Sequence, residues 1–481
     1  MILAIDIGTS SFKSALWNFD GDRLVFAALP LSISTGDGTR HEAESRQWLR
    51  SFEECCRRFA ASAGSLSPVE VIVISGNGPS LTPVLGGPVL DAEGLNLPAA
   101  PSRLWLERRA VAAASEVSAL MGGYVDPGFY LPKALAIKND EPELYERTNF
   151  FLGCPEYLAC ALTGEARTVF PAEGFDRWFW NAGILAKLKL DAAKFPPFIK
   201  PGETFGTLLP AVAARLGLTP RTPVVSGGPD FFAAILGAGV TSPSQACDRA
   251  GTSEGINVCT RQRITDERLM SYGHPIKPFW NLSGIISTTG KAIEWARDLL
   301  GLADFKELYA LAAASRPGAG GLVFLPYLAG ERAPIWDPAV RGVLRGLGLS
   351  SGRAEFARSI LEGICFAIRD VITVMEEAGA EVGELRLSGA AAQSRILNQI
   401  KADVTGKETL VPAQKEAELL GLAVIGASAL GRYSSFTEAA SALTRIESRL
   451  FPDEKNASLY ERLFREYRDT YRALAPNGRQ I

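Results

Sequence analysis

The arrangement of apolar and polar positions along the chain predicts a mixed α/β fold. Residues 1–7 (MILAIDI) and 69–76 (VEVIVISG) are largely apolar runs, which are typical of strands buried on both faces. Residues 45–62 carry apolar side chains at helical spacing, and we expect a further helix over residues 102–121. Strands and helices therefore alternate through the first half of the chain.

The second half repeats this plan, so the internal repeat is the size of a domain. We expect strands near residues 247–250 and 255–259, a strand that runs into a turn over 383–391, and helices over 291–300, 305–314, 351–378, 418–431 and 456–474. We place one domain boundary near residue 240, which divides the chain into residues 1–240 and 241–481.

Composition narrows the class of protein. The length of 481 residues fits two large domains, and the net charge of −3, with Lys and Arg spread among acids, argues against a nucleic-acid partner. Only two His occur, which disfavours histidine zinc sites and a Ser-His-Asp triad. The seven Cys lack metal-ligand spacing, so we expect reduced, buried thiols in a cytoplasmic protein. No apolar run is long enough for a bilayer, and the opening strand predicts no secretory signal.

The first thirteen residues carry the first candidate chemistry. Asp6 lies near the end of a buried strand, where a carboxylate is costly unless something compensates it, and a divalent cation is the usual compensation. Gly8, Thr9 and Ser10 follow in a turn whose N–H groups and hydroxyls suit phosphate oxygens, and Lys13 adds a positive charge. The alternative interpretation is a plain strand–turn–strand with a solvated lysine.

A similar arrangement of strand, glycine turn and neighbouring carboxylate recurs downstream. Residues 224–239 form an apolar strand that ends in glycines and presents Asp230 at the start of an Ala-rich helix. Residues 248–258 contain a second hydroxyl-bearing turn at Gly251 and Thr252. Two such devices in two halves of the chain predict a nucleotide held between two domains.

Five further segments, in order, resemble those of the FGGY carbohydrate kinases, a branch of the actin-like sugar kinases that includes xylulose, gluconate and glycerol kinases. They are WLERR (105–109), LTGE (162–165), TTGKAIEW (288–295), LPYLAGERAPIWDPAVRGVLRGL (325–347) and LSGAAAQSRILNQIKADVTG (387–406). The resemblance implies two actin-like, ribonuclease H-like α/β domains with a nucleotide cleft between them. Residues 1–240 are then the sugar and phosphate side, and residues 241–481 the adenosine side.

The resemblance implies an ATP-dependent kinase that phosphorylates a hydroxyl of a small sugar. Asp230 matches the catalytic aspartate and is expected to act as general base, although Asp also favours a helix N-cap. Asp6, with Asp230, is expected on the metal side, holding Mg²⁺ through water. The expected phosphate contacts are Gly8, Thr9, Ser10, Lys13, Gly251 and Thr252.

Adenosine is expected on the second domain. The residues that match family contacts are Gly290, Glu294, Gly389, Ala390 and Ser394, and the alternative for all five is a packing role alone. Ala390 stands where the family usually has glycine, and its methyl group lies near the nucleobase. Glu294 replaces a common glutamine and, when ionised, only accepts hydrogen bonds.

The expected sugar site comprises Asn77, Gly78, Trp105, Glu107, Asp230 and Phe231. Asn77 is shorter than the glutamine common in the family, Glu107 replaces an aspartate, and Phe231 stands where many pentulose kinases have a polar residue. Trp105 is expected either to pack on a sugar face or to be a core residue of an amphipathic helix. A ketopentose such as xylulose is the first candidate substrate.

Two other classes remain as alternatives. One is a nucleotide-binding regulator of the actin-like ATPase superfamily with lost or altered sugar specificity. The other is a Rossmann-type oxidoreductase, which the absence of G-x-G-x-x-G after the first strand disfavours. The expected partners are a small-molecule sugar and no nucleic acid or membrane, and the family resemblance fits a homodimer.

Overall fold

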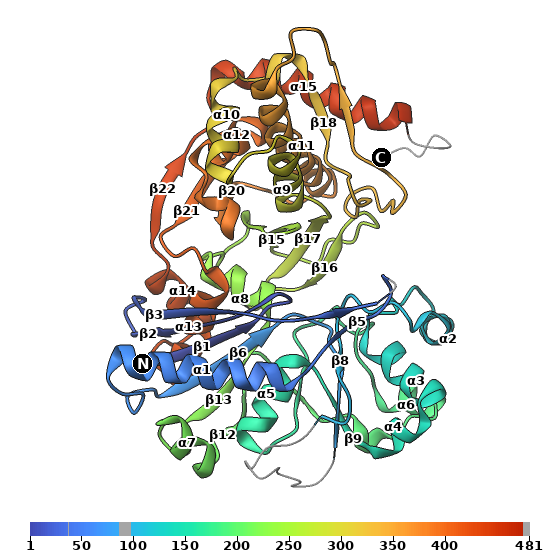
Figure 1. Cartoon of the computed structure of the whole chain (residues 1–481), viewed down its shortest axis with the longest axis vertical. Coiled ribbons are helices and arrows are strands. Elements are labelled where there is room, and N and C mark those ends of the chain that lie inside the picture. The colour runs from blue at the N-terminus through green and yellow to red at the C-terminus, as the bar shows by residue number, and fades with distance from the viewer. Residues whose placement is uncertain (37, 86–97, 475–481) are drawn as a thin grey trace. The chain divides into compact units, whose positions relative to one another are not determined.

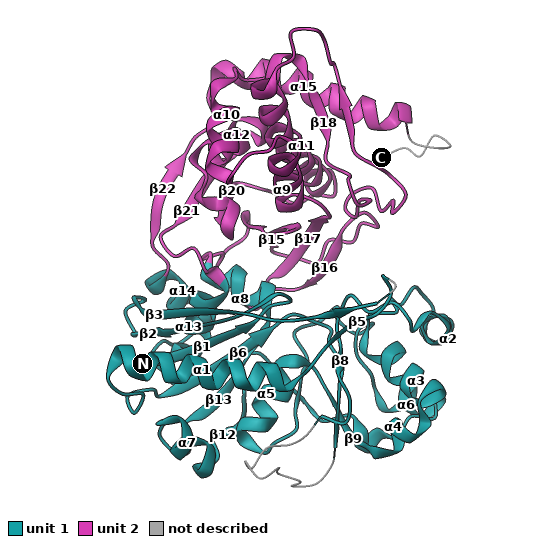
Figure 2. Cartoon of the chain, viewed as in Figure 1, with its two compact units in different colours: residues 1–237, 418–443 teal, residues 238–417, 444–481 magenta. Residues whose placement is uncertain are grey.

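In the computed structural model, which describes residues 1–36, 38–85 and 98–474, the chain forms two compact units. Unit 1 comprises Met1–Gly237 and Glu418–Leu443, and unit 2 comprises Ala238–Ala417 and Thr444–Ile481 (Figure 2). The first crossing lies close to the expected boundary near residue 240. The units are not continuous halves, however, because residues 418–443 return to unit 1.

Unit 1 is built on a six-stranded sheet (Figure 1). Its strand order is β12 (Thr204–Thr207), β13 (Pro223–Pro229), β6 (Val71–Gly76), β1 (Ile2–Ile7), β2 (Ser11–Trp17) and β3 (Arg23–Pro30). Strands β13, β6 and β1 are mutually parallel, and β12, β2 and β3 pair antiparallel to their neighbours. The strands β1 and β6 are buried at every position, as their apolar runs predict.

Helices lie on both faces of this sheet. The amphipathic α1 (Arg46–Ala63) buries Trp48, Phe52 and Phe59 from one face, and it ends at Gly64, which has a φ of 77°. The apolar α13 (Ala417–Ala429) approaches the sheet closely because Gly426 has no side chain: a Cβ there would meet Val73 at 2.8 Å. This packing explains why the segment belongs to unit 1.

Shorter elements complete unit 1. They are β4 (Ser34–Thr35), β5 (His41–Ala43), β7 (Thr82–Leu85), β8 (Ser102–Arg103), β9 (Thr148–Leu152), β10 (Thr168–Val169), β11 (Phe198–Ile199), α2 (Val111–Met121), α3 (Tyr130–Asp140), α4 (Pro142–Arg147), α5 (Cys154–Thr163), α6 (Ala182–Lys187), α7 (Pro210–Leu216), α8 (Asp230–Gly237), α14 (Phe436–Leu443) and the 3₁₀ turn η1 (Ala192–Lys194).

Unit 2 is built on a seven-stranded sheet. Its order is β16 (Met270–Gly273), β17 (Trp280–Ile286), β15 (Glu254–Thr260), β14 (Gln245–Ala250), β20 (Glu384–Ser388), β21 (Glu408–Pro412) and β22 (Ile446–Leu450). β14 is parallel to β20, and β20 is parallel to β21, whereas the other pairs are antiparallel. Each unit therefore places three antiparallel strands beside two further parallel strands, which is the repeated plan that the sequence predicts.

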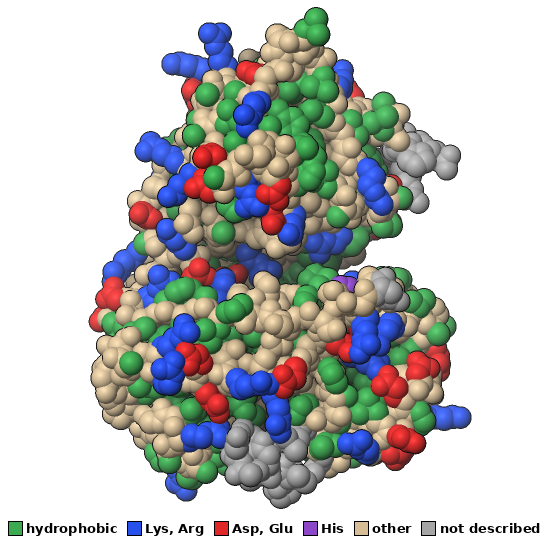
Figure 3. All heavy atoms as spheres, viewed as in Figure 1, with side chains coloured by type: hydrophobic (Ala, Val, Ile, Leu, Met, Phe, Trp, Pro, Cys, Tyr) green, Lys and Arg blue, Asp and Glu red, His purple; other side chains and the backbone are tan. Residues whose placement is uncertain are grey.

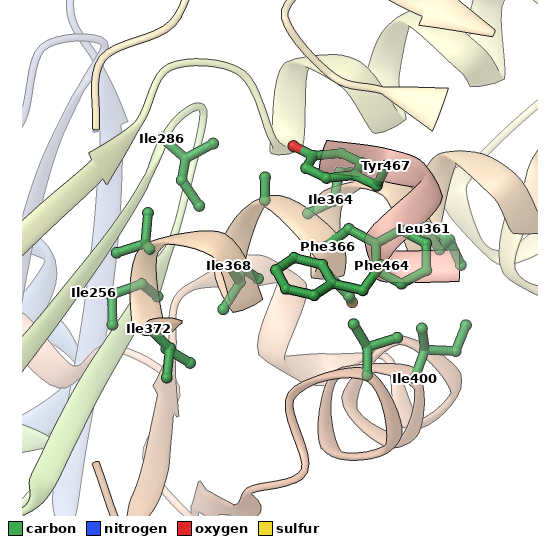
Figure 4. Close-up of a cluster of buried hydrophobic side chains, with 14 of the residues drawn as sticks. Ile256, Ile286, Leu361, Ile364, Phe366, Ile368, Ile372, Ile400, Phe464 and Tyr467 are labelled. Atoms are coloured by element: carbon green, nitrogen blue, oxygen red, sulfur yellow. The ribbon is translucent and has the colours of Figure 1, made fainter. Parts of the chain in front are cut away.

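The core of unit 2 surrounds one long helix. α11 (Arg353–Glu377) carries Ile364, Phe366 and Ile368, which pack with Phe464 and Tyr467 of α15 (Glu454–Leu474) in Figure 4. The remaining elements are α9 (Gly290–Leu299), α10 (Phe305–Ala314), α12 (Arg395–Thr405), β18 (Val323–Leu325), β19 (Val343–Arg345) and the 3₁₀ turns η2 (Ala319–Gly321) and η3 (Ala390–Gln393). All the expected helices of this half are confirmed to within a few residues.

One expected element is wrong in its first half. The helix expected over residues 102–121 begins only at Val111, because Ser102–Arg103 form a strand and residues 104–110 form a loop. Trp105 is therefore not on an amphipathic helix. The physical cause includes a long-range hydrogen bond from the backbone N of His41 to the Glu107 carboxylate.

Surface and thiol properties follow the composition. Lys and Arg side chains are interspersed with Asp and Glu on the face in Figure 3. All seven Cys are buried and carry free thiols. Among the described residues, no helix is long and apolar enough to cross a bilayer.

Candidate active site

Three parallel strands of unit 1 end at the same edge of the sheet. Ile7 of β1 pairs with Gly76 of β6, and Gly76 pairs in turn with Pro229 of β13. Because the carboxyl ends of neighbouring parallel strands meet, the residues at those ends are brought together: Asp6, Asn77 and Asp230. These three residues lie far apart in sequence.

The turn that follows β1 carries the first group of candidate residues. Asp6 is 5% exposed and lies directly opposite Lys13 in the β1–β2 ladder. The turn closes through a hydrogen bond from Gly8 N to Ser11 O at 2.9 Å, and a Cβ at Gly8 would crowd that same oxygen. Ser10 is exposed and Thr9 is half-buried.

Trp105 joins this turn to a second predicted motif. Its indole Nε1 donates a hydrogen bond to Thr9 Oγ1 at 3.0 Å, and the ring is only partly buried. Trp105 is thus neither a core residue nor part of a helix. It is a loop residue whose polar edge contacts the glycine turn.

Glu107 fixes the loop that carries Trp105. Its carboxylate, 1% exposed, accepts hydrogen bonds from the backbone N of His41 and from the backbone N, Nε and Nη2 of Arg109. Burial alone raises the pKa of Glu107, but the bonds to Arg109 and to the backbone hold that pKa below its usual value. The geometry therefore favours a positioning role, since four acceptor positions are already used within the protein.

Asn77 and Lys133 shape the turn that follows β6. Asn77 Nδ2 donates to Ile7 O at 2.9 Å, and its Oδ1 accepts from Ser80 Oγ at 3.1 Å. The fully buried Lys133 donates from Nζ to the carbonyl oxygens of Pro79, Arg103 and Leu104 at 2.6–3.2 Å. Burial lowers the pKa of this lysine well below its usual value. Lys133 thereby ties the Asn77–Gly78 turn to the Trp105 loop.

Asp230 begins helix α8 and is half-buried. Its Oδ1 accepts a hydrogen bond from the backbone N of Phe231 at 2.7 Å. The ring of Phe231 stacks with Phe175 at a centroid separation of 6.2 Å and meets Phe232 edge-on at 4.9 Å. A carboxylate at a helix N-terminus is favoured by the helix dipole, and here it has an aromatic neighbour rather than a polar one.

Unit 2 brings its own predicted residues together around the Gly251–Thr252 turn. Gly290 N donates to Gly251 O at 3.1 Å, and a Cβ at Gly290 would overlap that oxygen. Gly389 has a φ of 84°, and a Cβ there would overlap Ala250 O. Both glycines are therefore required by close backbone approach, and the turn itself is exposed.

The remaining adenosine candidates are Ser394, Glu294 and Ala390. Ser394 is the N-cap of α12, its Oγ accepting from Leu397 N at 3.4 Å, and it is 7% exposed. Glu294 on α9 forms an ion pair with Lys291 at 2.6 Å and is partly exposed. Ala390 lies in η3, directly after Gly389, and is exposed.

Sequence reasoning missed two buried lysines next to these sites, Lys133 in unit 1 and Lys401 in unit 2. Lys133 is a single cation within the apolar first part of α3, and this mismatch is the one signal that the sequence offers. Lys401 lies among polar and apolar residues of α12, where a lysine is not unusual. Their partners lie far away in the chain, so the pattern alone does not identify the roles.

The candidate metal ligands at the edge of the unit 1 sheet are carboxylates. Within the described parts of the chain, no group of three or more His, Cys, Asp or Glu side chains is arranged to hold a metal ion. The oxygen donors Asp6 and Asp230 at one sheet edge fit a hard cation that also takes water or substrate oxygens as ligands.

The repeated α/β plan, with a glycine turn at strand ends in each unit, defines an actin-like phosphotransferase. Comparison with known proteins agrees. Residues 1–237 match the N-terminal domain of the FGGY family of carbohydrate kinases, and residues 249–430 match its C-terminal domain. The chain belongs to this family, so it is an ATP-using kinase with an alcohol acceptor. The expected fold of two ribonuclease H-like domains is confirmed.

Individual relatives extend over the whole chain. The xylulose kinase of Escherichia coli is 28% identical, with 99% of each chain covered, and that of Staphylococcus epidermidis is 27% identical, with 98% of this chain and 96% of the relative covered. The crystal structure of a xyloylose kinase from Brucella ovis superposes with a TM-score of 0.86 at 26% identity, covering 98% of this chain and 99% of that one. The gluconate kinase of Lactobacillus acidophilus, with a TM-score of 0.85 at 23% identity, supports the fold alone.

Proposed function

We propose that this chain transfers the γ-phosphoryl group of ATP to a hydroxyl of a small sugar, with a ketopentose such as xylulose as the first candidate. The observation that carries the proposal is the convergence of Asp6, Asn77 and Asp230 at one edge of the unit 1 sheet. The names of the full-length relatives support the ketopentose.

Asp230 is the proposed general base. At the start of α8 the carboxylate accepts a hydrogen bond from Phe231 N, which orients it, and the carboxylate is proposed to take the proton of the attacking hydroxyl. Phosphoryl transfer needs positioning and charge neutralisation more than covalent chemistry, and the proposed role of Asp230 requires only one positioned carboxylate.

The phosphates of ATP are proposed to bind to the turn of Gly8, Thr9 and Ser10, with Lys13, and to Gly251 and Thr252. Asp6 and Asp230 are the proposed ligands of Mg²⁺, in part through water; the bound ion supplies charge neutralisation at the transferring group. Adenosine is proposed to contact Gly290, Glu294, Gly389, Ala390 and Ser394.

The acceptor is proposed to lie beside Asn77, Gly78, Trp105 and Phe231, with Glu107 holding the Trp105 loop in place. Phe231 offers no hydrogen bond to a sugar hydroxyl, and its stacking on Phe175 keeps the ring in an aromatic environment. A site that lacks a polar partner discriminates only weakly against an acceptor without the matching hydroxyl. Deoxysugars therefore belong in the first panel of substrates.

The test is ADP release by the purified protein with MgATP against ketopentoses, aldonates, deoxysugars, polyols and glycerol, with a no-sugar control. Strong stimulation by one acceptor supports the proposal and identifies the substrate class. Rapid ATP hydrolysis that no acceptor stimulates contradicts it and favours a regulator. We further propose a homodimer, on the family resemblance, and the molar mass from light scattering tests it.

A further inference from the structure

A deeply buried charged cluster of unit 2 lies on the two strands that flank the Gly251–Thr252 turn. Lys401 Nζ bonds Glu254 Oε1 at 2.7 Å and also bonds Asp248 Oδ2. The three side chains are at most 3% exposed. Burying three ionisable groups is costly, and such a cluster is weak evidence for stability by itself. Its placement therefore calls for a specific role.

The two acids lie on the two strands that flank the turn. Asp248 is on β14 and Glu254 is the first residue of β15, where it pairs with Ala250 and closes the hairpin. The ammonium group of Lys401 thus bonds both strands of the β14–β15 hairpin close to the turn that joins them. Because the ion pairs are inaccessible to solvent, salt and water screen them little.

The lysine comes from the helix that carries an adenosine candidate. Ser394 is the N-cap of α12, and Lys401 follows it by seven residues, which places the two on the same face of the helix about 10 Å apart along its axis. Both are buried. Lys401 itself is too buried to contact a nucleotide, so any effect on binding passes through the hairpin and the helix.

The turn is joined to a third nucleotide candidate by backbone hydrogen bonds. Gly290 N donates to Gly251 O at 3.1 Å, and Lys291 N donates to Thr252 O at 3.3 Å. A displacement of the hairpin root therefore moves the start of α9 as well. No side chain separates the start of α9 from the turn, since Gly290 has no space for a Cβ beside Gly251 O. Gly389 likewise has no space for a Cβ beside Ala250 O.

The three groups of the cluster shift one another's pKa values. Burial and the neighbouring Glu254 raise the pKa of Asp248 well above its usual value, whereas Lys401 contributes to lowering that of Glu254. Burial alone lowers the pKa of Lys401, but the two acids hold it above its usual value.

We propose that Lys401 is a positioning residue for the nucleotide, which fixes the Gly251–Thr252 turn relative to α12 and α9 by bonding Asp248 and Glu254 together. This inference rests on the proposed function, in which that turn binds phosphate. It concerns the affinity for nucleotide and not the sugar.

The test compares Lys401→Met with Arg358→Met by calorimetric titration of MgADP and by thermal unfolding. Arg358 is the matched control: it is a buried cation of the same unit, on α11, paired with Glu362 at 2.7 Å, and it lies in none of the nucleotide segments. Both variants are expected to unfold at lower temperature. Only Lys401→Met is expected to weaken MgADP binding, by about tenfold.

The outcomes separate positioning from a structural role. A lower folded fraction reduces the number of binding sites but not the dissociation constant of those that remain. Unchanged affinity in Lys401→Met, or an equal loss in Arg358→Met, overturns the inference. If Lys401→Met does not fold, Glu254→Leu decides, because it removes the β15 oxygen that Lys401 bonds; weakened MgADP binding supports the inference and unchanged binding overturns it.

This design also distinguishes the inference from the proposed function. A wild-type protein that does not bind MgADP overturns the phosphate-binding assignment, and the inference with it. A wild-type protein that binds MgADP and phosphorylates no sugar in the panel contradicts only the proposed substrate class, and the comparison of Lys401→Met with Arg358→Met stays decisive.

Discussion

The indole Nε1 of Trp105 donates a hydrogen bond to the hydroxyl of Thr9 at 3.0 Å, although the two residues are 96 positions apart. This bond ties the loop of residues 104–110 to the glycine turn after β1. In the proposed function it places a sugar-side residue and a phosphate-side residue in direct contact. The pair thus offers a way to measure how strongly the sugar side and the phosphate side of the proposed site depend on each other.

We expect Trp105→Phe to lower kcat/KM for the sugar by about threefold to tenfold, the size of one hydrogen bond of roughly 1 kcal/mol. Thr9→Val is expected to lower it by a similar factor. Steady-state kinetics of both single variants and the double variant tests the pair. If the bond matters, the double variant is no worse than the poorer single variant; fully additive losses contradict a role for the bond.

Asp230→Asn is expected to lower kcat by about 10³-fold, because an amide does not accept the proton of the attacking hydroxyl. The amide oxygen still accepts from Phe231 N, so the start of α8 is expected to keep its structure. The unfolding temperature measures that integrity. Asp140→Asn, at the exposed end of α3, is the control and should retain full activity. Substantial turnover in Asp230→Asn would rule out the base assignment.

Phe231→Asn is expected to change substrate preference more than rate. The new amide can hydrogen-bond a sugar hydroxyl, and sites built for such bonds reject analogues that lack the hydroxyl. We expect the ratio of kcat/KM for a ketopentose to that for its deoxy analogue to rise by about tenfold. Phe232→Leu is the control, since Phe232 is 1% exposed and is expected to affect stability alone. An unchanged ratio in Phe231→Asn would place the ring outside the acceptor site.

The parts of the fold that local pattern determines could be predicted from the sequence. Continuous apolar runs identified β1 and β6, and helical periodicity identified α1, α10 and α11. The first half of the helix expected over residues 102–121 failed for a different reason. There Glu107 bonds His41 N, 66 residues away, and this long-range contact overrides helix propensity.

The residues of the candidate site also differ in whether local sequence pattern identifies them. The carboxylates Asp6 and Asp230 could be identified because acids beside glycine turns at strand ends are unusual in a local pattern. The buried cations Lys133 and Lys401 could not, because their partners come from other elements: Asp248 lies 153 residues from Lys401. The return of residues 418–443 to unit 1 was equally hidden, since an apolar helix does not specify which core it joins.

Lys133→Met is expected to destabilise unit 1 by about 2–4 kcal/mol, because the carbonyl oxygens of Pro79, Arg103 and Leu104 lose a buried donor. Chemical denaturation measures this change. In variants that remain folded at the assay temperature, KM for the sugar is expected to rise while MgADP affinity is kept, since the lysine supports only the acceptor side. Lys138→Met, at a more exposed site on the same helix, is the control. Weakened MgADP binding in Lys133→Met would contradict the expectation that Lys133 supports only the acceptor side.

Glu156 predicts a specific dependence of stability on pH. It is 3% exposed on α5, accepts a hydrogen bond from Val169 N at 3.2 Å, and burial raises its pKa to about 7. A carboxyl whose pKa is higher in the folded than in the unfolded chain binds more protons when folded, so its stabilising contribution is complete below about pH 4.5 and is lost as pH rises through 7.

Glu156→Gln removes this titration. Relative to wild type, the variant is expected to gain up to about 3 kcal/mol in the free energy of unfolding between pH 5 and pH 8. Denaturant unfolding at several pH values measures the difference, and Glu146→Gln, at an exposed position of the same unit, is the control. The comparison between variant and wild type cancels the other titrating groups. A constant difference across that range would show that Glu156 is ionised in the folded protein throughout, and that its burial is compensated by a partner.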